Sequence, residues 1–254
     1  MMLARLLATA VLTLCASLPA AAQVPAYPTG TVRLVVPFAA GSMTDILSRA
    51  LAEKLTATWG QQVLVENKPG LPGTASVAKA TPDGATLIVT SNGLTVLKAI
   101  NKDLSFDPIA DFAPITKIAV IPLVMVAPPD SPAKSLKELV AAVKEKPGQM
   151  TYSAVGLGSA TGIASVQFLE QAGLKMNMLS HKGTPDLHTA IVRGDASWGF
   201  TFYNVAGDLI QSGKMKALVV TGAERLPQLK DVPTFAEAGF PQIKYDAWFG
   251  MAAP

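Results

Sequence analysis

Two short runs of small residues could bind an anion through the backbone. The first run contains Gly41, Ser42 and Thr44; it follows the apolar residues 32–36 and precedes an amphipathic stretch, residues 46–55. Small residues let a ligand approach the backbone closely, and the first amides of a helix lack an intrahelical acceptor and carry partial positive charge. A strand, a tight loop and a helix N-terminus in this order therefore predict a site for an anion such as a carboxylate.

The second run repeats this design farther along the chain. Residues 156–162 are rich in glycine and hydroxyl side chains; they follow the predicted strand 150–154 and precede the predicted helix 163–172. Polar residues after other predicted strands, and a histidine beside Lys182-Gly183, extend the candidate site. The candidate ligand-binding residues are Phe38, Ala39, Gly41, Ser42, Thr44, Asp45, Ser91, Asn92, Gly156, Gly158, Ser159, Thr161, His181, Thr201 and Phe202.

Several candidates also have a purely structural interpretation. Asp45 either contacts the ligand, orients the loop or caps the helix, since Asp is a common helix cap. The hydroxyls of Ser42 and Thr44 either donate to a carboxylate or cap the helix locally. Thr201 and Phe202 either face a cleft or pack within a sheet. His188 is predicted to lie on the surface of a helix.

Other kinds of site find little support. His181 and His188 are the only histidines, and neither belongs to a cluster with metal-ligand spacing, so no metal is expected. The run 156–162 has neither a following Lys-Ser or Lys-Thr pair nor Gly-x-Gly-x-x-Gly spacing, and it lacks a Gly-x-Ser-x-Gly elbow. We therefore expect no cofactor and no catalytic residue; a hydrolase that pairs Ser159 with a distant histidine is a weaker alternative.

The N-terminus has the pattern of an export signal. Arg5 precedes the apolar residues 6–18, and Ala20-Ala21-Ala22 offers a small-residue cleavage site, so residues 1–22 are predicted to be a cleaved signal peptide and the protein is expected to be exported. The only cysteine, Cys15, lies inside this segment, so the mature chain is expected to have no disulfide. The formal net charge is only +3, with no basic run, which argues against a nucleic-acid partner.

Strands and helices alternate along the remaining chain. This alternation predicts parallel α/β sheets in two halves, with a ligand held in a cleft between them. A Pro/Gly cluster at 67–73 is predicted to be a loop. The predicted strands are 32–36, 63–66, 86–90, 114–126 (broken by Pro122), 150–154, 176–179, 198–202 and 217–221, and the predicted helices are 46–55, 74–80, 136–146, 163–172, 185–193 and 205–212.

An ordered set of motifs resembles the periplasmic substrate-binding proteins of tripartite tricarboxylate transporters, also called Bug-type receptors. The motifs are Tyr27-Pro28, residues 33–38 with Gly41, Thr44 and Asp45, and then 65–70, 82–84, 86–87, 106–108, 111–114, 152–153, 182–183, 213–214, 217–218, 231–234, 237–239 and 248–250. The resemblance implies an α/β type II periplasmic binding protein fold. Residues 23–127 and 246–254 are then expected to form lobe 1 and residues 128–245 lobe 2, with hinge segments near Val126 and Asp246.

The resemblance also implies a function. Such receptors bind a small organic acid, gripping one carboxylate with the loops after Pro37 and after Tyr152, and deliver it to a membrane permease without a cofactor or metal. We expect a monomer that captures its ligand by closure of the two lobes. A ligand sensor that partners a signalling kinase remains an alternative, because the same cleft would serve both functions.

This chain departs from the family pattern around the expected cleft. Ser42 stands where a second glycine is common, residues 91–96 lack the usual Thr and His, and His181 replaces a Tyr. Residues 200–202 are Phe-Thr-Phe in place of Phe-Asp-Asn, which removes an acid and leaves open an unusual, more apolar ligand. The chain stops at Pro254, where family members usually continue, so exposed apolar surface on lobe 1 is expected and a truncated, non-binding remnant is a further alternative.

Overall fold

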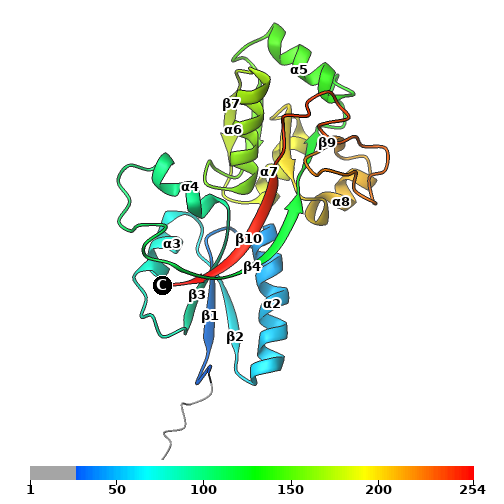
Figure 1. The fold of residues 1–254 in the computed structure, drawn as a ribbon. Coiled ribbons are helices and arrows are strands. Elements are labelled where there is room, and N and C mark those ends of the chain that lie inside the picture. The colour runs from blue at the N-terminus through cyan, green and yellow to red at the C-terminus, as the bar shows by residue number, and fades with distance from the viewer. Residues whose placement is uncertain (1–26) are drawn as a thin grey trace, which may run out of the picture.

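The computed structural model describes residues 27–254, which form two lobes, each built on a five-stranded sheet (Figure 1). In the first lobe the strand order is β2-β1-β3-β10-β4, with β1, β2 and β3 parallel and β10 antiparallel to both of its neighbours. Its elements are β1 (Val32–Val36), α2 (Met43–Trp59), β2 (Val63–Asn67), α3 (Leu71–Ala78), β3 (Thr86–Ser91), α4 (Gly93–Ile100), β4 (Ala113–Pro122) and β10 (Asp246–Ala253).

The second lobe has the strand order β7-β6-β8-β5-β9. Its core is aromatic: Trp198 stacks on Tyr152 with ring centroids 5.3 Å apart, and Phe168 and Phe200 meet Trp198 edge-on. Its elements are β5 (Val124–Ala127), α5 (Leu136–Glu145), β6 (Thr151–Ala154), α6 (Ala160–Ala172), β7 (Asn177–Ser180), α7 (Thr184–Arg193), β8 (Trp198–Thr201), α8 (Tyr203–Gln211) and β9 (Lys216–Val220). The predicted two-lobe α/β fold is confirmed.

Two strands run side by side between the lobes. β10 (red in Figure 1) pairs along the whole of β4, from Asp246 opposite Pro122 to Ala253 opposite Ala113. β5, however, pairs with β8 and β9 in the second sheet, so the expected lobe boundary after Ala127 does not match the sheets. The N–H of Leu123 donates to Thr221 Oγ1 (2.8 Å) and its carbonyl accepts from Thr221, so the chain has already entered the second lobe there. We therefore place the boundary at Leu123.

Local sequence signals explain where the helices begin. Ser42 and Ser135 cap α2 and α5, each accepting an amide N–H three residues later, as their side chains predict. The helix α3, by contrast, begins at Leu71, inside the predicted loop 67–73. Pro72 lies in the first turn of α3. Backbone N–H groups in this turn have no intrahelical acceptor, so a proline, which lacks the N–H, costs the helix no hydrogen bond there. The helix α4 was not predicted at all, although Leu94 and Leu97 have helical spacing.

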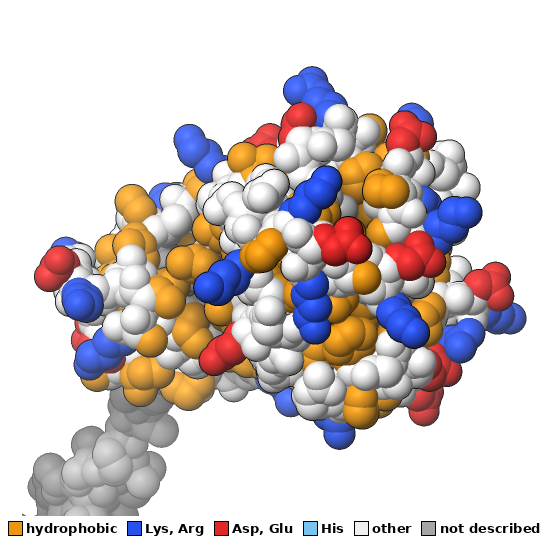
Figure 2. Space-filling model, turned by 90° about the horizontal axis from the view of Figure 1, so that it is seen from above, with side chains coloured by type: hydrophobic (Ala, Val, Ile, Leu, Met, Phe, Trp, Pro, Cys, Tyr) orange, Lys and Arg blue, Asp and Glu red, His pale blue; other side chains and the backbone are white. Residues whose placement is uncertain are grey.

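The surface carries mixed charges and some apolar area. On the face in Figure 2, Lys and Arg side chains intermix with Asp and Glu, without a continuous basic band. Ile109 and Ile115 are exposed beside a groove of about 430 Å³ over β4 and β10 of the first lobe. Within residues 27–254, no helix is long and apolar enough to cross a membrane. The predicted signal peptide, residues 1–22, lies outside the described residues.

Candidate functional site

The N-termini of α2 and α6 lie on either side of the gap between the lobes, and both are capped in the same way. Ser42 Oγ accepts the N–H of Asp45 (3.3 Å), and Ser159 Oγ accepts the N–H of Gly162 (3.0 Å). The carbonyls of Ser42 and Ser159 accept the next amides, those of Ile46 and Ile163. Within residues 27–254, nothing accepts a hydrogen bond from the first two amides of either helix, which belong to Met43, Thr44, Ala160 and Thr161.

A small cavity of about 30 Å³ lies between these two helix N-termini. A space of this size holds a single small group, such as a water molecule or a carboxylate. Four free amides at two helix N-termini favour the anion, since both helix dipoles place partial positive charge there. The lining residues are Phe38, Ser42, Met43, Thr44, Ser91, Val155, Ser159, Ala160, Thr161, Thr184, Phe202 and Phe249.

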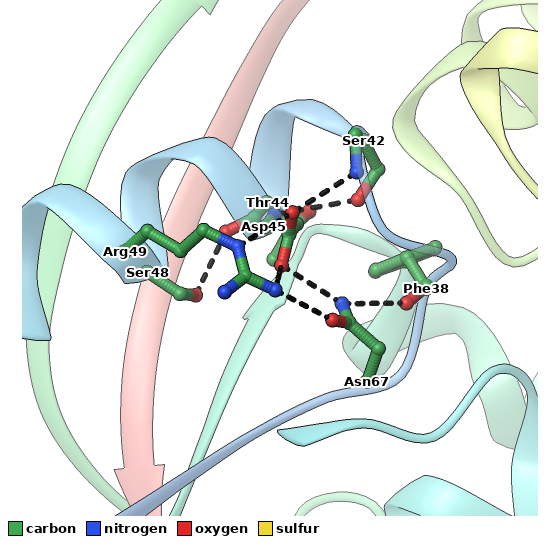
Figure 3. Close-up of polar contacts among 8 residues, drawn as sticks. Phe38, Ser42, Thr44, Asp45, Ser48, Arg49 and Asn67 are labelled. Carbon is green, nitrogen blue, oxygen red and sulfur yellow. Dashed lines mark hydrogen bonds and ion pairs between the residues drawn. The ribbon is translucent and has the colours of Figure 1, made fainter. Parts of the chain in front are cut away.

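Asp45 holds the first loop in place through side-chain hydrogen bonds and does not line the small cavity (Figure 3). Its carboxylate accepts the N–H of Gly41 (2.9 Å), the side-chain amide of Asn67 (2.9 Å) and the guanidinium of Arg49 (3.1 Å). Burial alone would raise the pKa of Asp45, but the hydrogen bonds from Arg49, Gly41 and Asn67 outweigh it and lower the pKa. Asn67 also donates to the carbonyl of Phe38 (3.2 Å), so one network fixes both ends of the loop.

One hydroxyl in the small cavity has no partner. Ser91 Oγ, at the end of β3, is buried and makes no hydrogen bond to any residue of the described range 27–254. A buried polar group without a partner lowers the free energy of unfolding, so an orphaned hydroxyl facing a cavity indicates a ligand or water that completes it.

We expect Ser91→Ala to separate binding from stability. The variant removes an unsatisfied hydroxyl, so its free energy of unfolding should equal or exceed that of the wild type. A ligand that bonds to Ser91 should bind about 3- to 10-fold more weakly, the range of one neutral hydrogen bond. Urea unfolding and calorimetric titration measure the two quantities; a variant that loses stability but keeps its affinity would show that Ser91 serves the fold instead.

A second, larger cavity of about 720 Å³ adjoins the small one, and both are lined by Phe38 and Val155. Its walls come from α3 and α4 of the first lobe and from the loop after β6 of the second. Its lining residues are Pro37, Phe38, Pro69, Gly70, Leu71, Thr74, Thr90, Gly93, Leu94, Leu97, Ile100, Asn101, Val155, Gly156, Leu157, Gly158, His181 and Lys182.

The lobes touch across this cleft at glycines. A Cβ built on Gly93, at the start of α4, would overlap the carbonyl of Gly158 in the second lobe. A Cβ built on Gly183 would lie only 2.6 Å from the Cβ of Ala39 in the first lobe. The close approach at these two points means that the structure describes a closed arrangement, and that a side chain at either glycine would hold the lobes apart.

The predicted site residues divide into two groups. Most of them line one or both cavities: Phe38, Ser42, Thr44, Ser91, Gly156, Gly158, Ser159, Thr161, His181 and Phe202. Ala39, Gly41, Asp45, Asn92 and Thr201 line neither. Among these, the side-chain amide of Asn92 donates to Tyr245 Oη (2.6 Å), next to β10. Asn92 therefore links the first lobe to the segment that returns from the second.

Sequence reasoning missed two kinds of lining residue. Met43 and Ala160 line the small cavity, and the signal for them was their position directly after a serine cap. Leu94, Leu97 and Ile100 lie on the unpredicted helix α4. Their spacing of three residues was the signal that could have shown an apolar face there.

Thr201 and His188 form a buried pair inside the second lobe. Thr201 Oγ1 lies 2.7 Å from His188 Nε2, and both side chains are buried. The prediction that His188 lies on a helix surface is therefore wrong, because α7 packs this face against β8. Burial lowers the pKa of His188 from its ordinary 6.5 to about 4, so the ring is neutral at pH 7.

This pair predicts a loss of stability in weak acid. Between pH 6.5 and about 4, His188 is protonated in the unfolded state but neutral in the folded state. The free energy of unfolding therefore falls as the pH falls. The loss should approach roughly 3 kcal/mol at pH 4. Burial also lowers the pKa of His181, with Asp186 and Asp195 opposing it, so His181 adds to the same slope. Urea unfolding of the wild type and His188→Gln from pH 7 to 4 should show a flatter profile for the variant; identical slopes would contradict this assignment.

The hydrolase alternative requires Ser159 beside a histidine, and the structure does not place one there. Ser159 Oγ bonds to the carbonyl of Gly156 and to Thr161 Oγ1. His181 Nε2 instead lies 2.8 Å from Ser153 Oγ, which is fully buried in β6. Among residues 27–254, no group of three or more His, Cys, Asp or Glu could hold a metal ion.

Solved structures similar to this one include a periplasmic binding protein. Periplasmic binding protein BugD superposes with a TM-score of 0.84 at 33% identity, covering 90% of this chain and 77% of that one. MatC from Rhodopseudomonas palustris, solved with bound malate, superposes with a TM-score of 0.83 at 32% identity, covering 90% and 79%.

Sequence comparison assigns the family. The model for the tripartite tricarboxylate transporter family receptor matches residues 47–254. A UPF0065 protein from the tcbD-tcbE intergenic region of Pseudomonas sp. (strain P51) is 32% identical and covers 98% of this chain and 76% of its own length. BugT of Bordetella pertussis is 30% identical over 94% of this chain and 75% of its own length. The chain belongs to the tripartite tricarboxylate transporter receptor family.

Proposed function

We propose that this protein is a periplasmic receptor that captures a small organic acid by its carboxylate and delivers it to the membrane permease of a tripartite tricarboxylate-type transporter. The observation that carries the proposal is the small cavity between the N-termini of α2 and α6. Its free amides come from both lobes, so a carboxylate there would favour the closed state over any open one. A ligand shifts such an equilibrium only as far as it prefers one state.

Relatives with the same fold support the carboxylate. MatC was solved with malate, and the protein Rpa4515 of R. palustris, 29% identical with a TM-score of 0.84, was solved with adipate. In this chain, neutral donors suffice for the bound carboxylate. No arginine within residues 27–254 lines either cavity.

A thermal-shift screen tests the proposal. The purified mature protein is heated with a panel of mono-, di- and tricarboxylates, and an acid present at 100 times its Kd should stabilise the fold by about 2.7 kcal/mol and raise Tm. Neutral amides of the same acids serve as matched controls and should give no shift. If no acid raises Tm, the proposal fails and the non-binding remnant is favoured. If an acid does raise Tm, co-purification with a permease or with a sensor kinase separates transport from signalling.

A further inference from the structure

The larger cavity is apolar, and its apolar side chains come from both lobes. Leu71 and Ile100 of the first lobe and Leu157 of the second stay 36%, 41% and 43% exposed while facing the same space. Exposed apolar groups gathered around one hollow usually mark a place where another apolar surface binds. The volume of about 720 Å³ falls within the range of small-molecule sites.

The ionisable side chains of this cavity are poorly suited to a second carboxylate. The ring of His181 is engaged with Ser153, and burial lowers its pKa, so it is neutral at pH 7. Among the lining residues the only side chain with a permanent positive charge is Lys182, which is exposed to solvent. A carboxylate placed among Leu71, Leu94 and Leu97 would lose its hydration without gaining comparable partners, which is costly.

The two cavities share lining residues, and this determines where the rest of a ligand would lie once its carboxylate is bound. Phe38 and Val155 line both, so a ligand whose carboxylate occupies the small cavity projects its remaining atoms past them toward α4. Building on the function proposed above, we propose that the ligand is an acid with one carboxylate and an apolar body, the length of hexanoate or longer or an aromatic ring, and that dicarboxylates are disfavoured.

Calorimetric titration of the mature protein with a matched series of acids tests this selectivity. Each methylene that leaves water for the cavity should tighten binding about fourfold, so hexanoate and octanoate should differ by about tenfold or more. Adipate, in which a second carboxylate replaces the terminal methyl group of hexanoate, should bind at least about tenfold more weakly than hexanoate. Phenylacetate should bind within the range of hexanoate and octanoate.

Two isoleucine variants locate the effect. Ile100→Ser removes an exposed apolar side chain from the cavity and should weaken octanoate about threefold to tenfold. Ile109→Ser removes another exposed isoleucine, which lines the separate groove over β4 and β10, and should leave octanoate binding unchanged.

The outcomes separate this inference from the proposed function. If adipate binds more tightly than hexanoate, the selectivity for apolar monocarboxylates is wrong while the carboxylate receptor stands. If Ile100→Ser and Ile109→Ser weaken octanoate equally, the body of the ligand does not lie in this cavity. If no mono- or dicarboxylate binds, the proposed function itself fails.

Discussion

Replacing Gly93 with alanine is expected to weaken the binding of an acid such as octanoate by about 100-fold, the equivalent of roughly 3 kcal/mol of overpacking. The new methyl group would overlap the carbonyl of Gly158 across the cleft. Neither atom can avoid the clash by a side-chain rotation, because the Cβ is bonded directly to the backbone and the carbonyl is part of it. The lobes would therefore have to stop short of closure. The free amides of α2 and α6 could then no longer reach the same carboxylate.

The fold itself should tolerate this substitution. Gly93 is the first residue of α4, and alanine is the better helix former there. Its clash involves only the opposite lobe, so it disappears when the lobes part. Gly30→Ala is the matched control, because a Cβ on Gly30 meets nothing within 4 Å and should leave affinity unchanged. Small-angle scattering with saturating octanoate should show a larger radius of gyration for Gly93→Ala than for the control; equal affinity and equal radius would contradict the closed arrangement.

Removing one backbone donor from the small cavity is the second large effect. Ala160→Pro deletes the N–H of the first residue of α6, where proline fits the helix. The preceding residue, Ser159, has φ −110° and ψ 162°, an extended conformation that proline accepts. A charge-assisted hydrogen bond to a carboxylate contributes about 1.5–3 kcal/mol, so the affinity for acids should fall roughly 10- to 100-fold.

A control of similar size distinguishes the lost donor from added bulk. Ala160→Val adds comparable volume at this buried position but keeps the N–H. Calorimetric titration should show a large loss for Ala160→Pro and a much smaller one for Ala160→Val, while urea unfolding reports any damage to the second lobe. Equal losses in both variants would mean that packing, and not the amide, governs binding.

The sequence predicted the framework of this site because its signals are local. The apolar residues 32–36 form β1 with the predicted bounds, and the two small-residue loops precede helices as expected. The side chains that determine this strand and these loops lie within a few residues of them in the sequence. The same reasoning identified Ser42 and Ser159, although both hydroxyls act as caps and leave the neighbouring amides for the ligand.

The features that sequence reasoning missed depend on contacts between distant residues. The hydroxyl of Thr201 is taken by His188 because α7 packs against β8, which no local pattern encodes. Loop support was one of the roles predicted for Asp45, but the partner Asn67, which donates to it from β2, was not predicted. The early entry into the second lobe at Leu123 likewise rests on Thr221, far along the chain. Such pairings follow from the packed fold and not from spacing.

The most direct test of the site observes the four free amides themselves. In ¹H–¹⁵N correlation spectra of the mature protein titrated with octanoate, the amide protons of Met43, Thr44, Ala160 and Thr161 should show the largest downfield shifts, because a carboxylate becomes their hydrogen-bond acceptor. Octanamide, with the same chain and no charge, should leave them nearly unmoved. Saturable binding of octanoate that leaves these four resonances in place would contradict a carboxylate held between the two helix N-termini.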